Sequence, residues 1–260
     1  MIENHALTRM RAGQPAFGLG VHHLRTAAVG LLAAEAGFDW LFIDCEHGAF
    51  SVQEATQICL AALPTTATPI VRVCKTALFE ATRVLDNGAM GVVIPHIDTA
   101  EEAQAVVDAC KYPPVGHRSL GGPAAQAGYK ALPSGQMMAD LNQRLLTCVM
   151  IETPEAVANI GAIAAVPGVD ALMIGTSDLT AEMGIPGEIG HANVVQAYTI
   201  LTQECARHGK IAGMGGVYDQ ENAARYIRLG VRFVLGGSDH ALLMAGAKAR
   251  ASFLKGLPTG

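Results

Sequence analysis

One short segment of the sequence combines two carboxylates with an imidazole. Asp44, Glu46 and His47 lie at the end of an apolar run that begins at Trp40. A carboxylate beside a histidine can fix the tautomer of the ring and raise its basicity, as a general base requires. Solvated acids followed by a helix-capping histidine would give the same pattern. Two interpretations therefore stay open: proton transfer by His47 with help from Asp44, or an ordinary polar loop.

Arg72 lies between Val71 and Val73 in a second apolar run that should be buried. A buried charge is costly unless it is paired. One possible partner is an acid of the protein, such as Asp44, in a structural salt bridge. The other is a substrate anion, to which the guanidinium can donate two parallel hydrogen bonds. The sequence is compatible with both.

Glu152 and Asp178 each follow a further apolar run. If these runs are neighbouring parallel strands, about 4.8 Å apart, both carboxylates can reach one cation. Two carboxylates with open positions beside them suit Mg²⁺ or Mn²⁺. Acids are also favoured at helix starts, which would explain Glu152 without a metal. Ser177 and Asp178 end a Gly-Thr-Ser-Asp turn, whose backbone N–H groups predict an anion site for a carboxylate.

Four other polar positions are weaker candidates. Lys75 follows the run that contains Arg72, but nothing around it indicates the dry pocket that a Schiff base needs. The pair His22-His23 is typical of a loop. Asp86, just before Asn87-Gly88, indicates a solvated acid at a helix end.

Eight short apolar runs alternate with helical patterns and would position these side chains. The runs are 16–21, 40–44, 69–73, 91–95, 145–152, 171–175, 210–214 and 231–236. Each is almost continuously hydrophobic, as expected for parallel strands that are covered on both faces. Between them, Ser51-Val-Gln-Glu54 and Thr99-Ala-Glu-Glu102 are capping boxes, and Thr153-Pro154 indicates another helix start.

Eight strands alternating with helices within 260 residues fit a (β/α)8 TIM barrel. A doubly wound open sheet has the same alternation. The number of runs, the lack of linker-like composition and the lack of a GxGxxG motif after the first run favour the barrel. We therefore predict an α/β protein with one domain, residues 1–260. The Gly- and Pro-rich segment 111–136 is irregular, and loops of that length are usually functional or mobile.

The composition argues against several classes of protein. Eighteen Lys and Arg against 23 Asp and Glu give a formal charge of −5, so no nucleic-acid-binding surface is expected. The apolar stretches are shorter than the ~20 residues of a membrane helix, and no secretory signal is expected. The six cysteines lack metal-site spacing, which indicates free thiols in a cytoplasmic protein. Hydrophobic residues reach 50%, so surface buried between subunits is expected.

Several motifs occur together in a fixed order. They are Gly37-Phe-Asp-Trp-Leu-Phe-Ile-Asp44-Cys-Glu46-His47-Gly, Val71-Arg72, Tyr112-Pro-Pro-Val-Gly-His-Arg118, Ile151-Glu152-Thr and Ile174-Gly-Thr-Ser-Asp178-Leu. In this order the chain resembles the HpcH/HpaI aldolase family, the metal-dependent class II pyruvate aldolases. The resemblance extends from residue 16 to about residue 254.

The resemblance implies a TIM barrel and a divalent cation, Mg²⁺, Mn²⁺ or Co²⁺, held by Glu152 and Asp178. It also implies a pyruvate-type substrate, held by Arg72 and by backbone N–H groups near Ser177 and Asp178. The expected reaction is the reversible cleavage of a 4-hydroxy-2-oxoacid between C3 and C4. The protein would then be a carbon–carbon lyase whose product is pyruvate or hydroxypyruvate together with an aldehyde.

In this scheme proton transfer is assigned to His47, oriented by Asp44. Glu46 would influence the pKa of a metal-bound water without binding the metal itself. Members of the family are commonly hexamers whose last helix, about residues 239–255 here, packs on a neighbour. Asp86 matches an acid that such a neighbour offers to the site. The expected partners are a small 2-oxoacid, an aldehyde and further copies of this chain, without nucleic acid or membrane.

The sequence departs from many members of that family in three places, one of which is the loop Arg118-Ser-Leu-Gly-Gly122, where Arg-Gly-x-Gly is common. Met150 stands where Gln is common and cannot hydrogen-bond a substrate oxygen. Gly20 stands where Trp is common, which predicts a roomier pocket wall. Two alternative functions also remain: a related barrel lyase for a CoA thioester or phosphoenolpyruvate-type substrate, and a non-catalytic oxo-acid-binding protein. A binder needs no base, so the presence of His47 and Asp44 argues against it.

Overall fold

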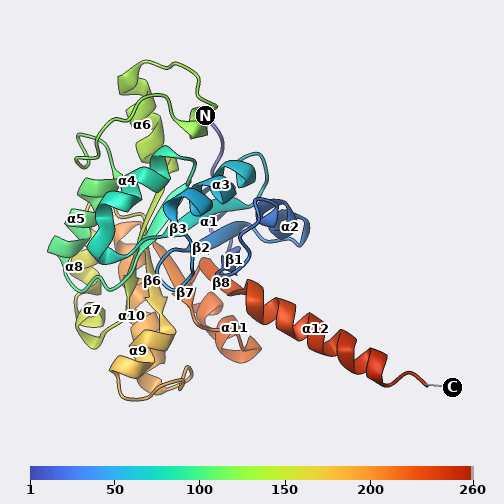
Figure 1. Ribbon diagram of the computed structural model, residues 1–260. Helices are drawn as coiled ribbons and strands as arrows, with labels where there is room; N and C mark the ends of the chain where they lie inside the picture. The colour runs from blue at the N-terminus through green and yellow to red at the C-terminus, as the bar shows by residue number, and fades with distance from the viewer. Residues whose placement is uncertain (259–260) are drawn as a thin grey trace.

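Eight parallel strands pair in chain order and close into a barrel, so that β1 lies beside both β2 and β8 (Figure 1). The strands are β1 (Ala16–Val21), β2 (Trp40–Asp44), β3 (Thr68–Arg72), β4 (Gly91–Ile94), β5 (Leu146–Ile151), β6 (Ala171–Gly175), β7 (Ile211–Gly215) and β8 (Phe233–Ser238). This computed structural model describes residues 1–258. The predicted TIM barrel is confirmed, and strand ends differ from the predicted runs by at most two residues.

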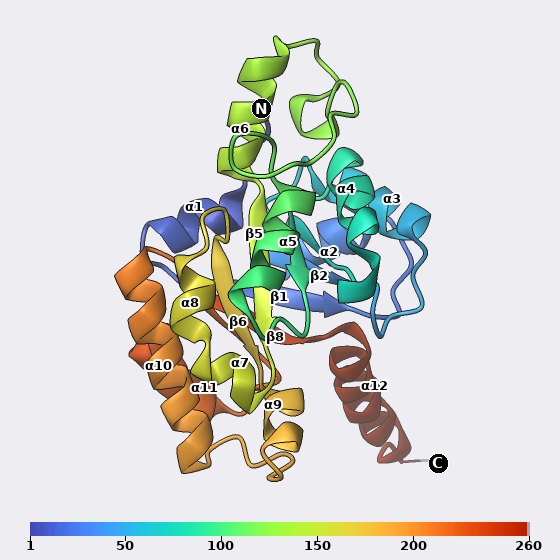
Figure 2. The ribbon, with the colours of Figure 1, turned by 90° about the vertical axis from the view of Figure 1, so that its left-hand side faces the viewer.

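Most of the helices connect successive strands and cover the outside of the barrel (Figures 1 and 2). They are α1 (His5–Arg11), α2 (Val29–Glu35), α3 (Val52–Ala62), α4 (Leu78–Asp86), α5 (Ala100–Cys110), α6 (Ser134–Arg144), α7 (Pro154–Ala158), α8 (Ile160–Ala165), α9 (Thr176–Glu182), α10 (Ala192–His208), α11 (Gln220–Leu229) and α12 (Asp239–Lys255), with short 3-10 turns η1 (Lys75–Ala77) and η2 (Ala125–Ala127). Of the two predicted capping boxes, the one at Ser51 and Glu54 is present, whereas the Glu102 carboxylate accepts the backbone N–H of Asp98 and not that of Thr99. Thr99 and Thr153 cap α5 and α7.

Alternate residues of each strand enter two separate apolar layers, as the two-residue period of a strand requires. Trp40 and Phe42 belong to the cluster inside the barrel, whereas Leu41 between them packs against the surrounding helices. The Trp40 ring stacks on Phe233 with their centroids 4.1 Å apart. Gly18 makes room for it, because a Cβ there would lie 2.2 Å from the ring. The interior is therefore a packed core.

The amino-terminal end of the barrel is closed. Three residues of α1 belong to the interior cluster, and the Gly- and Pro-rich segment and α6 lie at this end near the amino terminus (Figures 1 and 2). Gln126 fixes part of the segment, since its Nε2 donates to the carbonyl oxygens of Leu85 and Ala89. The segment expected to be functional or mobile thus lies away from the open, carboxyl end of the strands.

The last helix, α12, projects away from the barrel (Figure 1). All 17 residues of this helix belong to the described part of the chain, and Asp239 at its start is the one buried residue among them. Leu243, Met244 and Phe253 are more than half exposed. Such a helix, with apolar side chains in solvent along its length, is not explained by packing within its own chain.

Two further observations concern the cysteines and the possibility of a membrane helix. All six cysteines are free thiols, as predicted. Among residues 1–258, no helix has both the length and the apolar character needed to cross a membrane.

Candidate active site

A cavity of about 230 Å³ opens at the carboxyl ends of the strands. Its apolar lining comes from the core inside the barrel, through Phe42, Met150, Met173 and Leu235. Its polar lining consists of His22, His47, Arg72, Glu152, Thr176, Ser177, Asp178 and Tyr218. Active sites of TIM barrels form at this face from residues that follow the strands. The cavity is therefore the candidate active site.

Three adjacent strands bring His22, Asp44 and Arg72 into one row beside this cavity. The pairing register places Val21 opposite Ile43, so His22 comes level with Asp44. The next pairing places Asp44 opposite Arg72. The row is thus fixed by the backbone of the barrel.

Asp44 and Arg72 form a two-pronged ion pair. Arg72 Nε donates to Asp44 Oδ1 at 2.8 Å, and Nη2 donates to Oδ2 at 2.5 Å. The backbone N–H groups of Glu46 and His47 also donate to Oδ1. Burial by itself would raise the pKa of Asp44, but hydrogen bonds from His22 and Arg72 and the Arg72 charge hold it well below its usual range. Asp44 is therefore a fully buried carboxylate whose charged form is favoured by the groups around it and which holds Arg72 in place.

The first interpretation of Arg72, a salt bridge with Asp44, is confirmed, and its binding of a substrate anion stays a prediction. Besides Asp44, its Nη1 lies 3.0 Å from Glu46 Oε2, and the guanidinium lies over the Phe42 ring at 5.0 Å. The same guanidinium lines the cavity. Its carboxylate partners, Asp44 and Glu46, hold the guanidinium in a fixed position at the wall of the cavity. Such a fixed donor is what stabilisation of a developing oxyanion requires.

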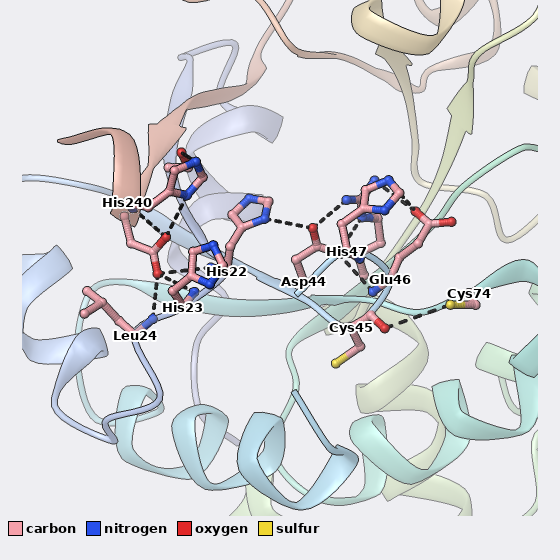
Figure 3. A network of polar contacts seen from close by, with 12 residues as sticks. His22, His23, Leu24, Asp44, Cys45, Glu46, His47, Cys74 and His240 are labelled. Atoms are coloured by element: carbon pink, nitrogen blue, oxygen red, sulfur yellow. Dashed lines mark hydrogen bonds and ion pairs between the residues drawn. The ribbon is translucent and has the colours of Figure 1, made fainter. Parts of the chain in front are cut away.

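The expected contact between Asp44 and the ring of His47 is absent from the described structure, because Asp44 meets His47 through the backbone N–H group alone. The imidazole of His47 is 64% exposed, and its nearest carboxylate oxygen is Glu46 Oε2 at 3.9 Å. The histidine whose ring Asp44 does contact is His22, with Nδ1 at 3.1 Å from Oδ2 (Figure 3). Its inward position, even-numbered like Gly18 and Gly20 on the same strand, was the signal that could have identified it.

Glu152 follows β5 and is almost fully buried. Its Oε2 accepts the backbone N–H of His96 at 2.8 Å, while Oε1 has no hydrogen-bond partner among the described residues. Gly175 on β6 makes room for it, since a Cβ at that position would lie 2.2 Å from Oε1. An unpaired buried carboxylate oxygen facing the next strand points to a ligand that the protein itself does not supply.

Asp178 stands in the first turn of α9, directly after β6, and lines the same cavity as Glu152. Burial, with a smaller contribution from the Asp178 charge, raises the pKa of Glu152 to about 7. A divalent cation would relieve both effects, so the pair fits a metal site. No group of three or more His, Cys, Asp or Glu side chains suited to a metal occurs among residues 1–258.

His96 is a second residue that sequence reasoning did not assign. Its imidazole bridges two acids, with Nδ1 at 3.1 Å from Glu152 Oε2 and Nε2 at 3.6 Å from Glu46 Oε1. Its φ of 56° is left-handed, a conformation that non-glycine residues adopt uncommonly. Its place just after the fourth apolar run was the available signal.

Ser177 and Asp178 begin α9, and both line the cavity. Gly175, at the N-cap position, offers no side chain to the first N–H groups of the helix. That these groups bind a substrate carboxylate stays a prediction.

The two remaining candidates lie outside the cavity. Asp86 ends α4, at the amino-terminal end of the barrel, and its Oδ1 accepts from Arg118 Nη2 at 2.6 Å. The predicted solvated acid is thus paired with a buried arginine. Lys75 Nζ donates to the His96 carbonyl and lies 2.5 Å from Glu102 Oε1. These two contacts hold the ammonium group of Lys75 outside the cavity, so it is not placed to form a Schiff base with a substrate there.

The wall beside Gly20 differs from the expectation of a roomier pocket. A Cβ at Gly20 would lie 3.2 Å from His22 Nε2 and 3.0 Å from the Gly237 carbonyl oxygen. The imidazole of His22 therefore fills the space next to Gly20. Met150 lines the cavity, as its inward position predicts.

The chain is similar to known proteins in both sequence and fold. The sequence model of the HpcH/HpaI aldolase/citrate lyase family matches residues 24–245. The 4-hydroxy-4-methyl-2-oxoglutarate aldolase cghB of Chaetomium globosum is 38% identical, over 96% of this chain and 94% of its own. A hydroxypyruvate/pyruvate aldolase of Pseudomonas aeruginosa is 35% identical, over 97% and 93%. The crystal structure of an HpcH/HpaI aldolase from Desulfitobacterium hafniense superimposes with a TM-score of 0.88 at 28% identity, covering 97% of both chains. The chain therefore belongs to the HpcH/HpaI aldolase/citrate lyase family.

Proposed function

We propose that this protein is a class II aldolase that reversibly cleaves 4-hydroxy-2-oxoacids into pyruvate, or hydroxypyruvate, and an aldehyde. Relatives over nearly the whole chain are named as aldolases of this kind. The observation that carries the proposal is one cavity lined by Arg72, Glu152 and Asp178. The carboxylate and ketone of a 2-oxoacid need positively charged partners, which a guanidinium and a cation held by two acids would provide.

The proposed metal is a divalent cation, Mg²⁺, Mn²⁺ or Co²⁺, held by Glu152 and Asp178. The support is the partnerless Oε1 of Glu152 and the repulsion between the two acids. Carboxylate oxygens suit these hard cations. When bound, the ion would supply Lewis-acid chemistry toward the substrate's carboxylate and ketone.

Arg72 would donate to the ketone oxygen, which gains negative charge as the C3–C4 bond breaks. Asp44 and Glu46 hold the guanidinium in place beforehand. The backbone N–H groups of Ser177 and Asp178 would bind the substrate carboxylate.

Cleavage also removes the proton of the C4 hydroxyl group. Two imidazoles line the cavity and can accept it, those of His47 and His22. The sequence-based hypothesis assigns this step to His47, with Asp44 as its orienting group. Glu46 lies beside both Arg72 and His96. It would influence the charge of the site without binding the metal or the substrate itself.

The function is tested by adding 4-hydroxy-2-oxoacids and Mn²⁺ to the purified protein and measuring released pyruvate with a coupled dehydrogenase. The expected result is turnover of at least one such acid, and formation of the same acid from pyruvate and its aldehyde. Saturable pyruvate binding without turnover of any acid in the panel would identify an oxo-acid-binding protein instead.

Substituting Gly175 should weaken metal binding. In Gly175→Ala the new Cβ would lie 2.2 Å from Glu152 Oε1, so the carboxylate must turn away. We expect Mn²⁺ affinity, measured by calorimetric titration, to fall about 10–100-fold, as for other disturbances of ligand orientation. The matched control is Gly215→Ala on β7, whose Cβ would meet nothing closer than 3.8 Å. Equal affinities in the two variants would contradict the assignment of Glu152.

We further propose a symmetric oligomer, a hexamer, in which α12 of each subunit packs on a neighbour. The support is the exposure of α12, including Leu243, Met244 and Phe253, together with its projection from the barrel (Figure 1). In that assembly Asp86, at the end of the barrel remote from its own cavity, would lie near the cavity of a neighbour.

Introducing charged residues on α12 should therefore dissociate the oligomer into smaller species. We expect the double variant Leu243→Asp, Phe253→Asp to elute as smaller species in size-exclusion chromatography with light scattering, because both side chains are exposed in one subunit and would be buried in the oligomer. Leu229→Asp on α11 is the control, since Leu229 is 39% exposed and lies outside α12. An unchanged mass for the α12 variant would rule out this role of the helix.

A further inference from the structure

We propose that His22 selects the donor substrate by accepting a hydrogen bond from the C3 hydroxyl group of hydroxypyruvate, a group that pyruvate lacks. The inference rests on the proposed aldolase function and narrows its substrates to 3,4-dihydroxy-2-oxoacids, which are cleaved to hydroxypyruvate and an aldehyde. Four observations support it: the free nitrogen of the ring, the oxygen atom that His22 shares with Arg72, the room beside Gly20, and the anchoring of the segment.

The contact with Asp44 determines which nitrogen of the His22 ring is free. Nδ1 lies 3.1 Å from Asp44 Oδ2 (Figure 3). The charged form of Asp44 is favoured by its surroundings, and a charged carboxylate can only accept hydrogen bonds. In the neutral ring Nδ1 therefore carries the proton, and the lone pair of Nε2 is available. That lone pair can accept from a hydroxyl group, whereas a methyl group offers it nothing.

His22 and Arg72 contact the same oxygen atom of Asp44. Arg72 Nη2 donates to Oδ2 at 2.5 Å, and His22 Nδ1 lies 3.1 Å from that oxygen. The guanidinium and the imidazole are therefore neighbours in the wall of the cavity, which both of them line. In the proposed function Arg72 holds the oxygen on C2 of the donor. Because C3 is bonded directly to C2, a hydroxyl group on C3 would come next to the imidazole.

Gly20 allows the imidazole to occupy this part of the wall. A Cβ at Gly20 would lie 3.2 Å from His22 Nε2 and 3.4 Å from its Cδ2, so a larger side chain there would displace the ring. The strands on either side of β1 contribute apolar side chains to the cavity, Phe42 from β2 and Leu235 from β8. His22 thus places a hydrogen-bonding nitrogen in a wall whose nearest strands supply none.

The segment that carries His22 is anchored at two levels. Asp239 Oδ2 accepts the backbone N–H groups of His22, His23 and Leu24 at 3.1, 2.8 and 2.7 Å (Figure 3). Asp44 holds the ring itself. A fixed acceptor discriminates between ligands, because a methyl group in place of the hydroxyl group would remove water from Nε2 without replacing its hydrogen bond.

This role leaves the bond-breaking chemistry of the proposed function unchanged. The C3 hydroxyl group keeps its proton, and the proton of the C4 hydroxyl group goes to the other imidazole that lines the cavity, that of His47. His22 would therefore be a residue that determines specificity. Its loss should change the choice of donor and leave enolate formation from pyruvate largely intact.

The test compares the two donors in the wild-type protein and in His22→Asn. With Mg²⁺ and no aldehyde, exchange of the carbon-bound protons on C3 with D2O is followed by NMR. The same donors are then compared in aldol addition to propanal, which has no hydroxyl group of its own. We expect the wild-type protein to favour hydroxypyruvate in both reactions.

In His22→Asn the amide can keep a donor toward Asp44, while the nitrogen at the position of Nε2 is lost. We expect kcat/KM for hydroxypyruvate to fall about 10–100-fold, the effect of one lost hydrogen bond at a fixed site. The value for pyruvate should stay within about threefold of wild type. His23→Asn is the matched control, because His23 is the next residue and its side chain does not line the cavity. It should keep the wild-type ratio of the two donors.

The other outcomes separate this inference from the aldolase function. A wild-type preference for pyruvate, or an unchanged donor ratio in His22→Asn, would overturn the role of His22 and leave the aldolase function intact. Equal losses with both donors would overturn it too, and would show that the ring serves to position Asp44 and Arg72. A wild-type protein that exchanges neither donor and cleaves no 4-hydroxy-2-oxoacid would overturn the aldolase function itself.

Discussion

Removal of divalent cations with a chelator is expected to abolish cleavage of 4-hydroxy-2-oxoacids, and Mg²⁺, Mn²⁺ or Co²⁺ should restore it. The physical reason is the buried carboxylate of Glu152, whose Oε1 has no partner among the described residues and which shares its cavity with Asp178. Without a cation, these two acids would repel the carboxylate of the substrate. The measurement is pyruvate release before chelation, after chelation and after addition of each metal.

The same experiment has a matched pair of variants. Glu152→Gln removes the charge of the proposed ligand and should abolish both Mn²⁺ binding and cleavage, whereas Glu155→Gln alters an exposed acid three residues further on and should change neither. Borohydride with pyruvate should leave the protein unlabelled, since Lys75 is held by Glu102 and the His96 carbonyl. Full activity in excess chelator, or a pyruvate adduct on Lys75, would contradict the metal mechanism.

Arg72→Lys should lower kcat roughly 10²-fold or more. Lysine keeps the charge but loses the planar fork with which Arg72 holds Asp44 through Nε and Nη2. It can no longer bind that carboxylate in two places and also face the cavity. Because the oxyanion next to Arg72 occurs in every reaction that passes through the enolate, three rates should fall together: cleavage, oxaloacetate decarboxylation and exchange of the pyruvate methyl protons with solvent.

This joint loss distinguishes Arg72 from the residue that accepts the hydroxyl proton, whose loss should affect cleavage alone. Arg83→Lys is the control, since the Arg83 side chain is 59% exposed on the outside of α4. The melting temperature should be recorded for both variants, because Asp44 is buried and depends on Arg72 for its charge balance. A well-folded Arg72→Lys protein that retains full proton exchange would show that Arg72 does not contact the enolate.

The architecture was predictable because parallel strands covered on both faces leave a simple pattern. Each strand is a nearly continuous apolar run, as in β2 (Trp40–Asp44), and polar side chains appear where it ends. For the same reason Arg72, Glu152 and Asp178 could be assigned to one face of the barrel from the sequence alone. What the runs could not predict was the projection of α12, because the apolar pattern of the strands carries no information on the direction of a helix that follows the last of them.

The partner of Asp44 was harder to predict because neighbours along the chain are not the neighbours in the barrel. His47 follows Asp44 by three residues, yet the chain turns there and only the backbone N–H of His47 returns to the carboxylate. His22 lies 22 residues earlier, and the β1–β2 register brings it level with Asp44. The register between strands depends on the closure of the whole barrel, so the even-numbered position of His22 could indicate that it faces inward but not that it lies beside Asp44. His22, which the sequence alone placed in an ordinary loop, therefore lines the cavity.

Asp239 has a consequence for the practical handling of this protein. It is the first residue of α12, and its carboxylate also accepts the backbone N–H groups of His22, His23 and Leu24. Mechanical load on the last helix therefore acts at the same carboxylate that anchors one wall of the cavity. The amino terminus lies at the opposite end of the barrel (Figure 1). Affinity tags and surface tethers belong at that end, where immobilised protein keeps both α12 and the cavity wall free of strain.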